Sequence, residues 1–197
     1  MTTARDKLLH AAGNRFYHHG INATGIDAIT TEAGVAKKSL YNNFASKAAL
    51  VDAYIDHRHQ EWLSLYRARE EQATSPAEKV LAVFDAYIAH AMDSYDDGFR
   101  GCGLLNAAAE FPAGTPARQA VNEHKQEVEA ILAKHLTEHL AEHPTEQPSQ
   151  LSTVNQVQQL AEHLSFLLEG AIARAGLEGT PQRLHNARLI AARMLAE

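Results

Sequence analysis

The sequence contains one cysteine, Cys102, which excludes an intrachain disulfide and any metal site built from several cysteines. None of its apolar runs approaches the roughly 18 residues that a helix needs to cross a bilayer. The first residues, MTTARDKLLHAAGNRF, hold no apolar stretch of signal-peptide length. We therefore expect a soluble, cytoplasmic protein with no membrane partner.

Alternating apolar and polar residues, the pattern of half-buried strands, are also missing. Apolar residues instead recur at helical spacing along the whole chain, and a hydrophobic content of 45% is enough for a packed core. We predict an all-α fold of about nine helices. The first helix is expected to stop at Gly20, and the second to lie between the Thr24 cap and Gly34. The others are expected at 37–43, from the Ser46 cap through Tyr66, from Pro76, and at 104–110, 116–142, about 153–175 and 181–196.

The chain as a whole lacks a net positive charge, since its net charge is −6. Its first 50 residues nevertheless hold six Lys or Arg against three Asp or Glu, a net charge of +3, which leaves −9 for the remainder. This asymmetry predicts a small basic head on a larger acidic body. DNA phosphates respond to the local field, so the acidic total does not exclude nucleic-acid binding.

Residues 24–47 have the pattern of a helix-turn-helix. Thr24 and Asp27 are placed to form a capping box at the start of the first helix. Gly34 can end that helix in a left-handed turn, and Ser46 can cap the long helix that follows the motif. Leu40 and Phe44, four residues apart, pack the second helix onto the first.

The second helix of this motif has a polar, cationic face with no role in the core. Lysines bind phosphates or the guanine edge, asparagine can pair with adenine, and Ser or Tyr reaches phosphate oxygens. An ordinary solvated face is the alternative reading. If the face binds DNA, its residues are Lys37, Lys38, Ser39, Tyr41 and Asn42, with Lys47 beside the Ser46 cap.

Residues 8–51, LLHAAGNRFYHHGINATGIDAITTEAGVAKKSLYNNFASKAALV, resemble the N-terminal domain of the tetracycline-repressor (TetR) family of bacterial regulators. The similarity lies in F…HHG, AGV, LYNNF and SKAAL. It implies a DNA-binding domain over 1–47, a ligand-binding and dimerisation domain over 48–197, and a homodimeric repressor released from operator DNA by a small molecule. It also implies backbone contacts from Tyr41, Asn42 and Lys47, with Lys37, Lys38 and Ser39 nearer the bases.

Two positions depart from the family pattern. The family often has Ser or Thr where this chain has Ala36, which cannot cap the recognition helix, and an acidic residue where this chain has Ala48. Both changes weaken helix ends slightly and leave the base contacts open.

Large apolar residues in the body, together with a few polar groups, are the candidates for an effector pocket. An ordinary packed core is the alternative for each of them. The candidates are Trp62, Phe84, Tyr87, Ile88, Phe99, Cys102, Asn106, Glu110, Phe111, His124, Phe166 and Glu169.

The last two helices each carry two apolar stripes, which predicts two packing partners for each. One stripe is expected to form a four-helix dimer seam, although the sequence does not distinguish the two stripes. The candidates for the seam are Leu164, Leu168, Ala171, Ala187 and Ala191.

Other chemistry finds little support. GCGLLN lacks the third glycine and the preceding strand of a dinucleotide fingerprint, and no catalytic motif is present, so we predict no catalytic residue, no cofactor and no metal. His135, His139 and His143 have a spacing that can hold zinc, but surface histidines are the simpler reading. Cys102, two residues after Arg100, could sense electrophiles, although a buried structural thiol is the stronger alternative. A helical scaffold that binds protein, or a cofactor-binding enzyme, remains as the alternative function.

Overall fold

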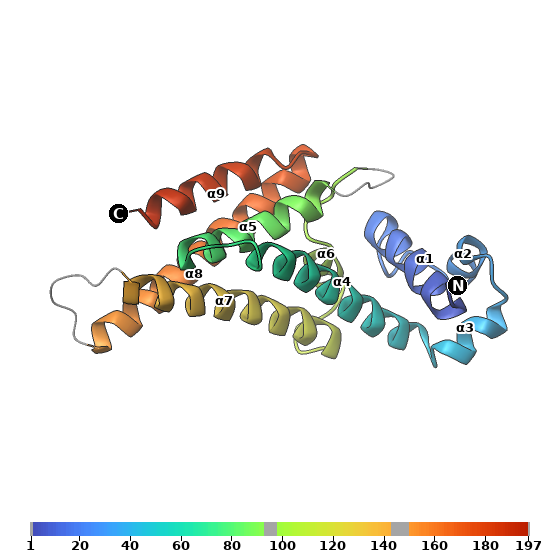
Figure 1. The fold of residues 1–197 in the computed structure, drawn as a ribbon. Helices are drawn as coiled ribbons and strands as arrows, with labels where there is room; N and C mark the ends of the chain where they lie inside the picture. Colours follow the sequence, from blue (N-terminus) through green and yellow to red (C-terminus); the bar gives the residue numbers. More distant parts are fainter. Residues whose placement is uncertain (1, 93–97, 143–149, 197) are drawn as a thin grey trace. The chain divides into compact units, whose positions relative to one another are not determined.

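The computed structural model describes residues 2–92, 98–142 and 150–196 of the chain. These residues form nine α-helices and no strands, as the helical periodicity predicts (Figure 1). None of the described helices is long and apolar enough to cross a membrane. The helices are α1 (Ala4–His19), α2 (Ile26–Ala33), α3 (Lys37–Asn43), α4 (Lys47–Glu70), α5 (Pro76–Met92), α6 (Gly103–Ala109), α7 (Pro116–Glu142), α8 (Gln150–Glu178) and α9 (Gln182–Met194).

The contacts divide the chain into two compact units. The head unit comprises residues 1–60 and 102–122, and the body unit comprises 61–101 and 123–197. Helix α6 therefore groups with the N-terminal helices, while α4 and α7 each contribute residues to both units. The division into functional domains at residues 47 and 48 is a separate matter and stays a prediction.

In the head unit, α1 packs against α2, α3 and α6. Leu8, Ile29 and Leu40 are fully buried at the centre of this packing, because their helical spacing places them on inward faces. At the start of α1, the Thr3 side chain accepts a hydrogen bond from the Asp6 N–H, and Asp6 caps the Thr3 N–H in return. This capping box escaped the sequence analysis.

The capping box predicted at the start of α2 is wrong. Gly25 occupies the N-cap position and makes no side-chain cap. The Thr24 hydroxyl is buried and donates instead to the Gly20 carbonyl at 2.6 Å, so it closes the turn after α1. The N-cap position belongs to Gly25, one residue further along, so the Thr24 side chain caps no N–H of α2.

In the body unit, α9 packs against both α5 and α8. Two glycines permit a close crossing within this unit. A Cβ atom on Gly176 of α8 would lie 2.5 Å from the Gly101 backbone nitrogen, closer than real Cβ contacts. Gly101 itself has a φ of 85°, in the region that favours glycine. The backbone just before α6 is therefore held directly against α8.

Candidate DNA-binding surface and ligand sites

The helix-turn-helix forms at the predicted residues. Gly34 ends α2 in the left-handed conformation with φ 64° and ψ 35°, which a residue with a side chain rarely adopts. The Val35 N–H then donates to the Thr30 carbonyl at 3.1 Å, which fixes the direction of the chain into α3. Leu40 and Phe44 are buried, so they hold α3 against the rest of the head unit.

The opposite side of α3 is open to solvent. Lys38, Tyr41 and Asn42 are exposed, and 49% of the large Tyr41 side chain is accessible although its ring could pack in a core. Ser39 is half-buried, and its carbonyl accepts a hydrogen bond from the Asn43 side chain at 2.8 Å. The predicted recognition residues thus occupy a surface that no other part of the described chain covers.

Lys37 is not a free cation, which the sequence analysis missed. Its Nζ lies 2.8 Å from Asp27 Oδ1, at the other end of the helix-turn-helix. This hydrogen bond, together with the Asp27 charge, raises the pKa of Lys37. Both side chains are mostly solvent-exposed, so the pair is weak and salt-sensitive. A phosphate that approached Lys37 would have to compete with Asp27.

Lys47 differs from the other predicted DNA contacts because it is half-buried. It is the first residue of α4, where the Ser46 hydroxyl accepts the Ala49 N–H at 3.1 Å and caps the helix as predicted. Lys47 makes no ion pair with any residue that the structure describes. No described residue therefore neutralises its charge through an ion pair.

A carboxylate clamp connects the loop after α1 to the end of α6 within the head unit. One oxygen of Glu110 accepts the Ile21 N–H at 2.6 Å, and the other accepts the Asn22 N–H at 2.7 Å. The Asn22 side chain returns a hydrogen bond to the Glu110 carbonyl at 3.3 Å. A Cβ on Gly20, which has a φ of 88°, would lie 3.0 Å from Glu110 Oε1. The loop between α1 and α2 is thus built around this side chain, which the sequence analysis placed among the pocket candidates.

An aromatic cluster occupies the body unit. The ring of Trp62 stacks on Tyr66, with centroids 5.5 Å apart, and meets His124 edge-on at 5.3 Å. Tyr87 lies 5.5 Å from Trp62, and its hydroxyl is 3.5 Å from His124 Nε2. The structure therefore brings together three of the predicted pocket residues, Trp62, Tyr87 and His124.

Charged groups complete this cluster. Lys125 Nζ lies over the Tyr87 ring, 5.3 Å from its centroid, and donates to the Tyr87 hydroxyl at 3.3 Å. Lys125 also pairs with Glu169 Oε1 at 2.7 Å. Trp62 Nε1–H and Glu169 Oε2 are buried and have no hydrogen-bond partner among the described residues. One donor and one acceptor in the cluster thus remain unpaired.

The other pocket candidates divide between the two units. Phe84, Ile88 and Phe99 are buried in the body unit, whereas Asn106 and Phe111 are half-buried in the head unit. The prediction for Phe166 is wrong, because 66% of its side chain is exposed on α8. Its side chain lies on the solvent-exposed face of α8, whereas Leu164 and Leu168, two residues before and after it, are buried.

Cys102 is the N-cap residue of α6 and is buried. Reactive cysteines are partly exposed and have a lowered pKa, while buried thiols are usually inert. The burial therefore favours the structural reading of Cys102 over thiol sensing.

The residues predicted to form the dimer seam are buried within one chain. Leu164, Leu168, Ala171, Ala187 and Ala191 are all buried by contacts inside the protomer, so none of them offers a surface to a partner. They form the packing of the body unit, in which α9 lies against α5 and α8. Ile172, on the second predicted stripe of α8, is buried as well, so the exposed stripe is one that the sequence did not predict.

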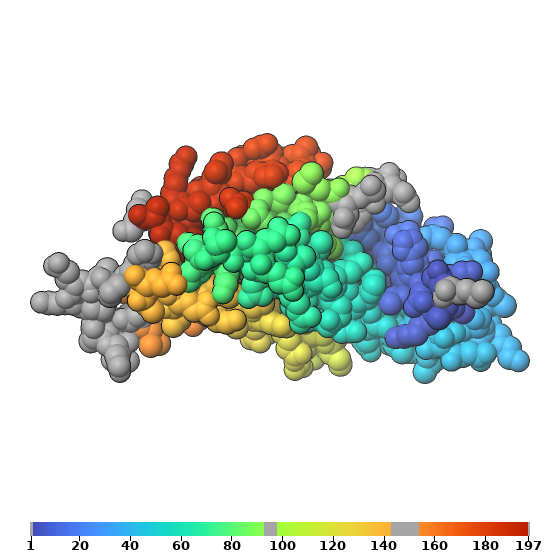
Figure 2. All heavy atoms as spheres, in the orientation of Figure 1, coloured from blue at the N-terminus to red at the C-terminus, as the bar shows by residue number. Residues whose placement is uncertain are grey.

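A different stripe of α8 is exposed. Phe166, Gly170, Ala173 and Leu177 recur at i, i+4, i+7 and i+11, which places them on one face. The face is open at its middle, since a Cβ atom on Gly170 would meet nothing within 4 Å. On α9, which lies at the surface of its unit in Figure 2, Leu189 and Ile190 are exposed as well.

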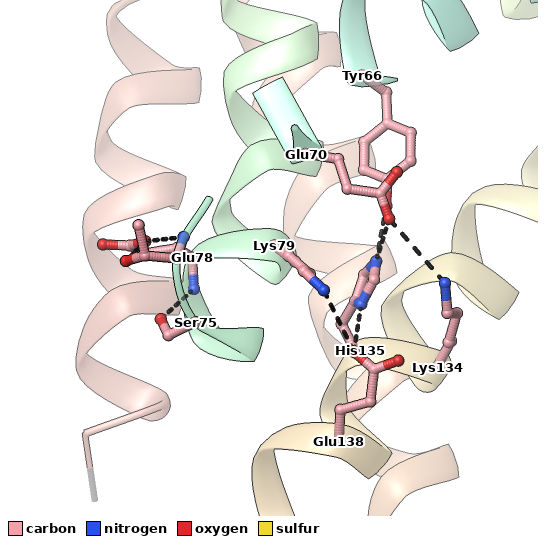
Figure 3. A network of polar contacts seen from close by, with 9 residues as sticks. Tyr66, Glu70, Ser75, Glu78, Lys79, Lys134, His135 and Glu138 are labelled. Atoms are coloured by element: carbon pink, nitrogen blue, oxygen red, sulfur yellow. Dashed lines mark hydrogen bonds and ion pairs between the residues drawn. The ribbon is translucent and has the colours of Figure 1, made fainter. Parts of the chain in front are cut away.

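His135 is the centre of a polar network (Figure 3). Its side chain is fully buried, with Nδ1 3.0 Å from Glu138 and Nε2 3.2 Å from Glu70 and 2.7 Å from the Tyr66 hydroxyl. Burial, with the nearby Glu70 charge, raises the pKa of Tyr66. The hydrogen bond from His135 lowers the pKa of Glu138.

The surface reading of the three histidines is wrong for His135, which is fully buried. His139 Nε2 lies 3.0 Å from the Leu195 carbonyl, and His143 lies outside the described residues. Across the described ranges, no three His, Cys, Asp or Glu residues are grouped so that they could hold a metal ion.

Comparison with known proteins agrees with the site geometry. The profile of bacterial regulatory proteins of the tetR family matches residues 8–54, and that of the tetracyclin repressor-like C-terminal domain matches residues 76–191. The HTH-type transcriptional repressor KstR2 of Mycolicibacterium smegmatis is 36% identical over 83 residues, which cover 42% of this chain and 40% of that protein. The chain thus spans about two fifths of the length of the curated relatives it matches.

Solved structures resemble nearly the whole chain. A TetR-family transcriptional regulator from Streptomyces coelicolor is 28% identical, with a TM-score of 0.81, over 98% of this chain and 93% of that one. A TetR-type regulator from Streptomyces avermitilis is 25% identical, with a TM-score of 0.74, over 98% and 96%. Because the C-terminal profile alone covers more than half of its residues, the chain belongs to the TetR family of bacterial transcriptional regulators.

Proposed function

We propose that this protein is a cytoplasmic, homodimeric repressor that binds operator DNA through α3 and leaves it when a small molecule binds the body unit. The observation that carries the proposal is the exposed polar face of α3 on a well-packed helix-turn-helix. Membership in a family of transcriptional regulators agrees with it and gives no support to an enzyme or a protein-binding scaffold.

The DNA contacts follow from charge and exposure. Lys38, Tyr41 and Asn42 are accessible on α3, and Lys47, at the start of α4, makes no ion pair with a described residue. Phosphate contacts position the helix without reading sequence, while base contacts specify it. We assign Lys47 to the phosphates and Lys38 and Asn42 to the base edges.

The test is selection of bound duplexes from a random pool, followed by salt titration of the selected duplex. Lys47→Ala should weaken all duplexes about equally and lower the salt slope by about one unit. Lys7→Ala, the same change at an exposed position of α1, is the matched control. Asn42→Ala should instead change which bases are selected. If neither α3 nor Lys47 substitutions alter duplex binding, the recognition surface is misassigned.

Dimerisation is proposed to use the exposed apolar face of α8 and α9. Two recognition helices that read successive major grooves must be held about 34–36 Å apart, which a two-fold dimer achieves. Phe166→Glu with Leu189→Glu should yield monomers with little operator affinity, measured by light scattering and anisotropy. Met92→Glu, an exposed apolar residue of α5, serves as the control. A double variant that stays dimeric would place the seam elsewhere.

The effector is proposed to bind at the aromatic cluster of the body unit. The unpaired Trp62 N–H and Glu169 oxygen would face an acceptor and a donor of the ligand, since buried polar groups are normally paired. Trp62 is the chain's only tryptophan, so its fluorescence reports this cluster alone. A screened compound that releases the operator without changing Trp62 emission would argue against this location.

Coupling between the two units is proposed to run along the backbone through α6. Gly101 is held against Gly176 of α8, the chain continues directly into α6, and Glu110 at its end holds the loop after α1. A shift of α8 would therefore pull on the clamp. Physical continuity of this kind is a route for coupling.

A further inference from the structure

The head unit contains a cavity of about 320 Å³ that is separate from the aromatic cluster. Its walls come from three segments, namely the loop after α1 with Asn22, the start of α4 with Lys47 and Val51, and the segment 111–117 with Phe111 and Ala117. All of these segments belong to one compact unit. The volume lies at the lower end of small-molecule sites, which span about 300–1,000 Å³.

The lining defines the chemistry that the cavity accepts. Val51 and Ala117 are buried apolar side chains, and Phe111 adds an aromatic ring. Lys47 is half-buried and pairs with no described residue, whereas the only acid of the lining, Asp52, is exposed at the surface. An apolar wall with one half-buried cation that makes no ion pair with a described residue suits a small apolar molecule that carries one anionic group.

We propose that this cavity binds a small aromatic or aliphatic carboxylate whose anionic group pairs with Lys47. The ligand and the operator then compete for the same ammonium group, a consequence that rests on the proposed role of Lys47 in phosphate binding. The ligand also touches Asn22, whose N–H is held by Glu110 at 2.7 Å, so it adjoins the clamp. This site requires no signal from the body unit.

Binding is tested first without DNA, on the full chain, by calorimetry with 3-phenylpropanoate and its amide 3-phenylpropanamide. The acid should bind at least tenfold more tightly than the amide, and Lys47→Gln should remove this preference. Ala117→Leu, which fills the cavity, should weaken binding of the acid at least tenfold. Ala120→Leu, on the same helix, should leave this binding unchanged. Ala48→Leu, at an exposed lining position, provides a second blocking variant if Ala117→Leu fails to fold.

Three results would overturn the proposal: no binding of the acid at millimolar concentration, equal binding of acid and amide, or full binding in both blocking variants. A second arm adds the selected operator duplex. The acid should raise the apparent Kd for the duplex in Ala120→Leu but not in Ala117→Leu. If the protein binds no duplex at all, the proposed function fails, while the calorimetry still decides the cavity site. If the acid binds and the duplex affinity stays constant, the competition is refuted.

Discussion

Replacing Glu110 by Gln tests the clamp between α6 and the loop after α1. The carboxylate accepts two backbone N–H groups, from Ile21 and Asn22, at 2.6 and 2.7 Å. Gln keeps one acceptor but directs an NH₂ group at the other N–H, so one charge-assisted bond is replaced by a donor facing a donor. Such bonds contribute about 1.5–3 kcal/mol, and because Glu110 is only half-buried we take about 1.5–2 kcal/mol.

This loss should lower the Tm by about 3–8 °C, given about 2–4 °C per kcal/mol for a chain of this size. Hydrogen exchange gives the local measurement, because the amides of Ile21 and Asn22 should lose protection before the core of α1. Glu71→Gln is the matched control, since Glu71 is exposed. Equal Tm values and equal protection at Ile21 and Asn22 in the two variants would refute the clamp.

Three further outcomes are expected. Asp27→Asn releases Lys37 from its ion pair, so duplex binding should tighten and its salt slope should steepen by up to about one unit; an unchanged slope would mean that Lys37 reaches no phosphate. Gly176→Ala forces a backbone shift and should cost about 1–3 kcal/mol in urea unfolding, and an unaltered midpoint would contradict the close crossing. The hydrogen bond with His135 lowers the pKa of Glu138 in the folded state, so ionised Glu138 stabilises the fold above about pH 4.5. This contribution is lost as the pH falls below that value. In urea titrations from pH 6 to 3, the free energy of unfolding should therefore decrease less in Glu138→Gln than in the unchanged protein.

Local signals explain which features the sequence predicted. Gly34, Leu40, Phe44 and Ser46 lie within a short segment, and each has a preference that depends only on its neighbours, such as a left-handed turn or a helix cap. The helix limits 37–43 and 116–142 agree with α3 and α7 for the same reason. Local propensity and periodicity point to the same fold here, which is typical of natural sequences.

Long-range partners explain what the sequence did not predict. Glu110 binds residues almost ninety positions away, and no periodicity encodes that pairing. Which face of α8 stays exposed likewise depends on where α9 packs, since residues of both predicted stripes are buried. Thr24 shows that a capping pattern does not by itself decide which residue becomes the N-cap, because Gly25 takes that position and the Thr24 hydroxyl closes the turn after α1.

The energetics of the clamp bear on how an effector could act. Allosteric coupling free energies are typically about 1–3 kcal/mol, and the clamp's charge-assisted bonds contribute about the same amount. Breaking the hydrogen bonds from Ile21 and Asn22 to Glu110 therefore changes the free energy by enough to account for release of the operator. No unfolding of the head unit is needed. A ligand at Lys47 would act on the same loop from the other side, through Asn22. The loop after α1 is thus the element whose arrangement both proposed ligands would bias, and an effector response that survives in Glu110→Gln would have to travel by another route.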